Sequence, residues 1–200
     1  MTLALATATP SSGERIYLDT SAVLPLALVE GGRRGQPTPP PREQQRAALV
    51  TAFGARAAKA GCKLVTSILA LEEIAARARN KARLQEQRTY SSWDDFRRAN
   101  ASAAEDAEKR CQAHMLATLT WTIDVLHGAG VTVDFPSVLA AETENFAKKL
   151  RKAHLELLRA YASIDPMDAL HIVFGLEGGA HGFVTFDGAW ASVREIVVYT

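Results

Sequence analysis

The chain has 200 residues, of which 48% are hydrophobic, and its 23 Lys and Arg against 22 Asp and Glu give a net charge of +1. A chain of this length can bury a sizeable core in one domain without disulfides or a structural metal. The balanced charge excludes a polycation that grips nucleic acid by net charge alone, although it leaves room for a local basic face.

The cysteines and the apolar segments predict the compartment. Cys62 and Cys111 show no CxxC spacing and no His at zinc-finger distance, which indicates two reduced thiols. Residues 1–14 lack a basic region followed by a long apolar run, so we expect a flexible tail there and no signal peptide. The apolar run 115–126 is too short for a bilayer, which needs about 20 residues. We therefore expect a cytoplasmic protein that does not enter the membrane.

Strand and helix signals alternate along the first part of the chain. Arg15 to Leu18 is a short run of strand-forming residues that ends at Asp19, the first residue of a polar turn. Ser67 follows a second short strand and is the predicted N-cap of the helix that carries Glu73. In chain order, we expect strands over 15–18 and 63–66, helices over 22–29 and 42–60, and a Gly- and Pro-rich loop over 31–41.

The rest of the chain begins with a long helical stretch. Apolar residues recur at helical spacing over 81–127 and predict two helices broken near residues 90–92. Asp165, Pro166 and Asp168 form a strong helix start, with an Asp N-cap, a Pro at the first helical position and an acid two residues later. We further expect a strand over 131–133 closed by Pro136, helices over 140–162 and 166–178, and strands over 182–186 and 196–199.

This alternation of strands and helices predicts an α/β fold with a central parallel sheet between helical layers. Residues 15–200 would form one domain behind the flexible tail over 1–14. The loop over 31–41 and the helical insertion around 81–127 would be additions to that domain.

Four acidic residues fall where chemistry usually lies in such a sheet. Asp19 and Asp187 directly follow strands, Asp168 is in the first turn of a helix, and Glu73 is in a helix that follows a strand. Two unit charges at about 4 Å repel by roughly 4 kcal/mol at an effective dielectric near 20. Converging carboxylates would therefore bind protons or a cation, and hard oxygen ligands select Mg²⁺ or Mn²⁺. Such an ion can activate water against a phosphodiester.

Four blocks of the sequence resemble the PIN-domain nuclease family. Ile16 to Ser21 is similar to the opening strand with its Asp and hydroxyl pair, and Val65 to Ile74 is similar to the strand, Ser and helix that carry the family's Glu. Asp168 to His171 is similar to the DALH helix, and Val184 to Asp187 to the TxD strand end. The order and the spacing agree from about Arg15 to the C-terminus.

The resemblance implies a PIN-like α/β/α sandwich that uses Mg²⁺ or Mn²⁺ to hydrolyse RNA phosphodiester bonds. It implies that Asp19, Glu73, Asp168 and Asp187 are both the metal ligands and the catalytic residues. Many small members are toxins of the VapC type, which an antitoxin protein inhibits and which often form homodimers. Whether this chain is such a toxin is left open, and the alternatives are a PIN-fold RNA-processing or DNA nuclease and a non-catalytic interaction module on the same fold.

Three of the acids also have a plainer structural interpretation. Asp19 and Asp187 are typical turn residues after strands. Asp168 could be the capping-box partner of Asp165, and Asp165 itself is interpreted as a cap and not as a ligand.

Glu72 and Glu73 compete for the fourth position. Adjacent helical residues point about 100° apart, so only one of them can face a pocket. Glu73 is favoured because it shares a face with Leu69 and Ala76, and because its spacing from Ser67 matches the family.

The remaining candidates support the site or the core. We expect His171 to be a packed core histidine and not a catalytic base. Thr20, Ser21 and Thr185 either hydrogen-bond a ligand carboxylate or are plain turn hydroxyls. The preferred contacts for an RNA backbone are Arg77, Arg79, Lys81 and Arg83; the basic run 148–152 is expected to be a solvated helix face, and Trp93, Trp121 and Trp190 are expected to pack in the core.

Overall fold

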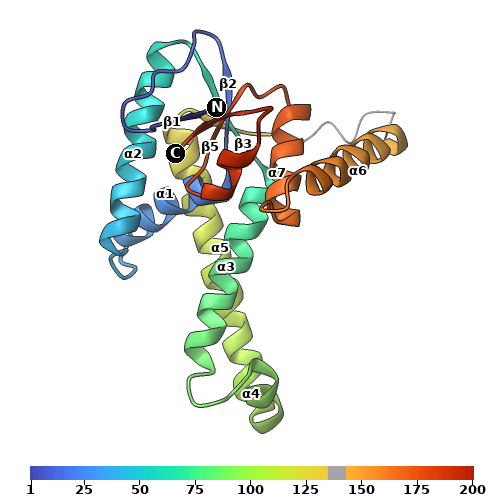
Figure 1. The fold of residues 1–200 in the computed structure, drawn as a ribbon. Helices are drawn as coiled ribbons and strands as arrows, with labels where there is room; N and C mark the ends of the chain where they lie inside the picture. Colours follow the sequence, from blue (N-terminus) through green and yellow to red (C-terminus); the bar gives the residue numbers. More distant parts are fainter. Residues whose placement is uncertain (135–142) are drawn as a thin grey trace.

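The central sheet is parallel throughout in the computed structural model, which describes residues 1–134 and 143–200 (Figure 1). Its strands are β1 (Thr2–Leu3), β2 (Arg15–Leu18), β3 (Lys63–Ser67), β4 (Val131–Asp134), β5 (Gly182–Val184) and β6 (Val197–Tyr199), in the spatial order β1-β6-β5-β2-β3-β4. The order reverses at β2, because the chain adds β3 and β4 on one side of β2 and later adds β5 and β6 on the other. Such a reversal leaves a crevice at the carboxyl ends of the strands, where ligands bind in open α/β sheets.

The two faces of the sheet are covered by different helices. Along β2, Ile16 and Leu18 belong to the larger hydrophobic core, whereas Tyr17 belongs to a second core on the opposite face, as the two-residue period of a strand requires. The larger core is covered by α1 (Thr20–Arg33), α2 (Pro41–Lys59), α3 (Ile68–Glu86) and α5 (Ala101–Gly128), and the second by α6 (Thr143–Ala160) and α7 (Pro166–Glu177). The protein is therefore α/β, with one parallel sheet flanked by helices, as predicted.

The helices α3 and α5 extend beyond the sheet as an antiparallel pair, with α4 (Trp93–Ala99) at the far end (Figure 1). We call this extension the helical arm. Its pairing is fixed by charged contacts, since Arg79 and Arg83 of α3 both bind Glu108 of α5. The predicted break near residues 90–92 is confirmed, and a second break occurs at Asn100, whose non-helical backbone separates α4 from α5.

Most predicted bounds agree with the structure to within one residue, including those of α2, β3, β4 and α7. The strand β5 ends two residues earlier than predicted, and beyond it Thr185 and Phe186 bond residues at the start of α1. Pro136 and the first residues of the predicted helix 140–162 lie outside the described residues. None of the described helices combines the length and the hydropathy needed to cross a bilayer.

The N-terminal segment differs from the expected flexible tail over 1–14. Thr2–Leu3 pair in parallel with β6, and the amino group of Met1 donates to the carbonyl oxygen of Ile196 over 2.9 Å. The side chain of Leu5 is buried in the larger core. These contacts are made with residues near the other end of the chain, so the local sequence gave no sign of them.

The predicted loop over 31–41 is shorter than expected, because α1 continues through Arg33. Arg34 bonds Glu30 one turn earlier over 2.8 Å, which supports the last turn of the helix. Gly31 lies against the ring of Trp121, where a Cβ would approach within 3.4 Å. The absence of a side chain at Gly31 therefore lets α1 run close to α5.

Candidate active site

The candidate residues converge on the carboxyl end of β2. Asp19 follows β2 directly, Ser67 is the last residue of β3, and Thr185 follows β5. Because β2 pairs with both β3 and β5, these three strand ends lie next to one another. The helices α3 and α7 then bring Glu73 and Asp168 toward the same end.

Asp19 is the most buried acid of the group, with 4% of its surface exposed. It is the N-cap of α1: its Oδ1 accepts from the backbone N–H of Ala22 over 2.9 Å and from the hydroxyl of Ser21 over 2.8 Å, while Oδ2 accepts from Thr185 over 2.8 Å. Burial raises the pKa of Asp19, and these hydrogen bonds partly offset the rise. A carboxylate has about four acceptor positions, so three donors leave about one for a further ligand.

The hydroxyls of Ser21 and Thr185 have a fixed direction. Each accepts a backbone N–H, Ser21 from Phe186 over 2.7 Å and Thr185 from Asp187 over 2.9 Å. Each hydroxyl then donates its own proton to the carboxylate of Asp19. The hydroxyls of Ser21 and Thr185 therefore bond a candidate ligand carboxylate and are not plain turn hydroxyls.

Glu73 faces the same end of the sheet, whereas Glu72 is exposed. Its Oε1 lies 3.5 Å from Nε2 of His171, and its Oε2 lies 3.8 Å from the guanidinium of Arg77. Burial alone would raise the pKa of Glu73. Hydrogen bonds from His171 and Thr20, together with the charge of Arg77, hold that pKa below its usual range. The spacing argument from the sequence therefore selected the inward-facing glutamate.

A buried network lies beneath these carboxylates, and the sequence did not reveal it. The hydroxyl of Tyr17 lies 2.6 Å from Oγ of Ser67 and 2.7 Å from Nδ1 of His171, and Nε2 of His171 lies 3.3 Å from Oγ1 of Thr20. His171 is 2% exposed, which confirms the expectation of a core histidine. Burial raises the pKa of Tyr17, and the charges of Asp19 and Glu73 raise it further.

The proton positions in this network follow from its acceptors. The carboxylate of Glu73 can only accept, so Nε2 of His171 carries the proton that points toward it. In the neutral tautomer Nδ1 then accepts from Tyr17, and Tyr17 in turn accepts from Ser67. The alternation of side chains along β2 could have indicated this network, because it places Tyr17 on the α7 face of the sheet, where His171 lies.

Asp168 occupies the first turn of α7, behind the predicted cap. Asp165 accepts from the backbone N–H groups of Met167 and Asp168 over 2.7 and 2.8 Å, which confirms its role as N-cap. Burial raises the pKa of Asp168 to about 6, with further contributions from the charges of Asp165, Asp187 and Asp19. The indole of Trp190 opposes this shift; its buried N–H lies near Asp168, although it makes no hydrogen bond of normal geometry within the described residues.

Asp187 lies at the exposed rim of the group. Its Oδ1 accepts from the backbone N–H of Ala189 over 2.8 Å and caps a short 3₁₀ helix, Gly188–Ser192. Oδ1 of Asp187 therefore has the role of a turn residue considered from the sequence. Its charge still acts on Asp168, so it also belongs to the acidic group.

The four acids form two connected halves. Asp19, Asp168 and Asp187 are coupled electrostatically, and Glu73 lies beside His171 and is linked to Asp19 through Thr20, the next residue in the chain. Within the described part of the chain, no three His, Cys, Asp or Glu side chains are close enough to enclose a metal ion in this conformation. The donor chemistry nevertheless fits a hard divalent cation, because the donors are carboxylate oxygens, Asp19 retains an acceptor position, and Asp168 lies among like charges.

The other sequence candidates lie outside this group. Among the basic residues, Arg77 lies beside Glu73, whereas Arg79 and Arg83 bind Glu108 in the helical arm and are less available to a phosphate backbone. Lys81 lines a cavity below Arg77. Trp190 is fully buried as expected. Trp93 and Trp121 are only partly buried: Trp93 packs on Phe96 in the arm, and Trp121 borders the same cavity as Lys81.

Comparison with protein-family models, with curated proteins and with solved structures found no match to this chain. The likeness to PIN-domain nucleases therefore rests on the four sequence blocks.

Proposed function

We propose that this protein is a PIN-like endoribonuclease that depends on Mg²⁺ or Mn²⁺. One observation carries the proposal: Asp19, Glu73, Asp168 and Asp187, from four separate segments, gather around the carboxyl end of β2, and burial together with mutual repulsion raises the pKa of Asp168. An acid that acts only as a turn residue or a helix cap needs no other acids beside it, so the grouping favours a shared role.

Asp19 is the anchor of the proposed site. Its two hydroxyl donors and one backbone donor fix both oxygens, so the carboxylate is oriented before any ligand arrives. Such preorganisation avoids an entropy loss on binding. Asp168 and Asp187 add negative charge on the α7 side.

Glu73 would complete the site from the opposite side. Nε2 of His171 lies 3.5 Å from Oε1 of Glu73 and would hold that oxygen in place, and Thr20 assists it. His171 and Tyr17 are therefore positioning residues in this proposal, and Glu73 is the group that faces the ion and the phosphate.

A divalent ion held by these carboxylates would supply the positive charge that activates water and stabilises the phosphodiester during in-line attack. A bound cation would favour the ionised form of Asp168, because its positive charge opposes the burial and the neighbouring acids that raise the pKa of Asp168. RNA is the substrate that the PIN resemblance implies, and an antitoxin or a second copy of the chain remains a predicted partner.

The test is cleavage of 5′-labelled single-stranded RNA by purified protein with Mg²⁺, with Mn²⁺ or with EDTA. We expect metal-dependent cleavage that Asp19→Asn and Asp168→Asn abolish, and that Asp106→Asn on the exposed side of the arm leaves unchanged. Asp168 is only half-buried, so its variant can be judged even if Asp19→Asn is unstable.

The same assay with DNA of the same sequence separates the substrate classes. If the protein cleaves the DNA and leaves the RNA intact, its substrate is DNA. Absence of cleavage in every metal condition, or full activity of both acid variants, would overturn the proposal.

A further inference from the structure

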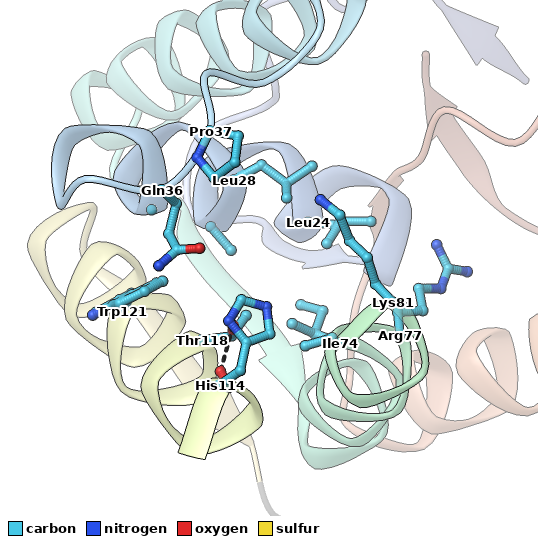
Figure 2. Close-up of a pocket in the computed structure, with 13 residues that line it drawn as sticks. Leu24, Leu28, Gln36, Pro37, Ile74, Arg77, Lys81, His114, Thr118 and Trp121 are labelled. Carbon is cyan, nitrogen blue, oxygen red and sulfur yellow. Dashed lines mark hydrogen bonds between the residues drawn. The ribbon is translucent and has the colours of Figure 1, made fainter. Parts of the chain in front are cut away.

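A cavity of about 200 Å³ lies one helical turn below the acidic group, between α1, α3, α5 and the segment after α1 (Figure 2). Leu24 and Leu28 of α1, Ile74 of α3 and Trp121 of α5 form apolar walls. Interiors of proteins are close-packed and rarely leave such a volume empty. The cavity is open to solvent on one side and is therefore accessible to a ligand.

Basic side chains lie on the α3–α5 side of this cavity. Figure 2 shows Lys81 and His114 beside it, whereas the guanidinium of Arg77 points away from it. Within the described residues, the ammonium group of Lys81 makes no ion pair or hydrogen bond, and neither does the imidazole of His114. The pKa of His114 is lowered by burial and by the charge of Lys81, which favours the neutral imidazole, so His114 can contribute an N–H donor and Lys81 the positive charge.

Arg77 is only weakly engaged by its partner. Its guanidinium lies 3.8 Å from Glu73, beyond hydrogen-bonding distance, and its side chain is 57% exposed. An apolar cavity with the ammonium of Lys81, unpaired among the described residues, and the imidazole of His114 at its edge has the complementary pattern for a ligand with an apolar body and a negative head group.

We infer that this cavity is a binding site for a small organic anion, a carboxylate attached to one aromatic ring or to a short hydrocarbon chain. The size follows from the volume, because an engineered cavity of about 150 Å³ holds benzene whereas drug-sized ligands occupy about 300–1,000 Å³. The ring would lie against Trp121 and the leucines of α1. The carboxylate would lie between Lys81 and His114.

The indole N–H signals in a ¹H–¹⁵N NMR spectrum can test this site. The chain has three tryptophans, one in the cavity wall, one in the arm and one in the buried core of the α7 face, so three signals are expected and Trp121→Phe assigns the relevant one. The probe is 3-phenylpropionate, with its neutral amide as a matched control. We expect saturable movement of the Trp121 signal with the carboxylate, and little movement of the Trp93 and Trp190 signals.

The second part of the test measures how binding depends on charge. Lys81→Gln should weaken binding of 3-phenylpropionate about fivefold, which is the scale of a partly exposed ion pair. Lys59→Gln, an exposed lysine on α2, should leave binding unchanged. Equal binding of the amide and the carboxylate, no saturable shift of Trp121, or equal effects of the two lysine variants would each overturn the inference. These outcomes do not depend on nuclease activity, so they are distinct from failure of the proposed function.

Discussion

Thr185 donates its hydroxyl proton to Asp19 over 2.8 Å, across the adjoining ends of β5 and β2. The two residues are 166 positions apart in the chain. The same hydroxyl accepts the backbone N–H of Asp187, so one buried side chain orients two of the candidate acids.

Thr185→Val should therefore weaken both the fold and the site. It removes one donor to buried Asp19, which costs about 1–3 kcal/mol for a buried group left unpaired, and it also removes the acceptor of the Asp187 N–H. Urea unfolding measures the change in the free energy of unfolding. The control is Thr122→Val, since the buried Thr122 hydroxyl donates only to a carbonyl of its own helix; an equal loss in both variants would contradict the special role of Thr185.

Asp168→Asn should stabilise the protein near pH 7 when EDTA removes divalent ions. The folded pKa of Asp168 is about 6, above its ordinary value of 3.8. Between these values the folded state binds more protons than the unfolded state, so wild-type stability falls as the pH rises through this window. The group is only half-buried, so we expect a gain of about 1 kcal/mol at pH 7 that vanishes below pH 4. Urea unfolding from pH 4 to 7.5 checks this, and a gain that does not change with pH would count against it.

Mn²⁺ should stabilise the wild-type protein by binding the folded state. At ten times its dissociation constant, one bound ion adds about 1.4 kcal/mol to the free energy of unfolding. Asp168→Asn should reduce that gain, and Asp106→Asn should retain it, because Asp106 lies in the arm. Thermal unfolding over a Mn²⁺ titration measures both effects, and a melting temperature that is independent of Mn²⁺ in the wild type would exclude a site of useful affinity.

Tyr17→Phe should remove the hydrogen bond that positions the ring of His171. The variant removes the hydroxyl that bonds Ser67 and His171, at a cost of about 1–3 kcal/mol. We also expect a change in the ¹⁵N shifts of the His171 ring, because Nδ1 loses its donor. Tyr199→Phe is the control, since the Tyr199 hydroxyl has only a 3.4 Å contact with Glu14; unchanged His171 shifts in Tyr17→Phe would refute the proposed proton arrangement.

Gly175→Ala should destabilise the contact between α7 and the sheet. A Cβ at Gly175 would lie 2.9 Å from Cζ of Phe183 and 3.2 Å from the ring of Tyr17. Such overpacking costs typically about 1–3 kcal/mol. Gly128→Ala, near the end of α5 where a Cβ meets nothing within 4 Å, should be neutral or slightly stabilising. Equal unfolding midpoints for the two variants would contradict this packing argument.

The sequence predicted those parts of the site whose chemistry is local. Asp165 as an N-cap, Asp19 at a strand end and Glu73 in place of Glu72 all follow from spacing within one element. Each of these interpretations needs only the geometry of a single strand or helix.

The parts it did not predict depend on contacts between distant segments. Tyr17 and His171 are 154 positions apart, and their hydrogen bond exists only because β2 and α7 share one face of the sheet. The strand Thr2–Leu3 depends in the same way on β6. The cavity beside Lys81 depends on how α1 approaches α5. The sequence predicted a loop over 31–41, so it did not show that α1 continues to Arg33.

The helix that carries Glu73 also forms one side of the arm. At 1.5 Å per residue, the 13 residues from Glu73 to Glu86 span about 20 Å of continuous helix. A stiff rod of this kind transmits an axial displacement of about 1–2 Å along its whole length, the range in which helices shift in switching proteins. Because Glu73 lies on this same helix, an axial shift of α3 in the arm would also move Glu73 relative to His171, which is 3.5 Å away.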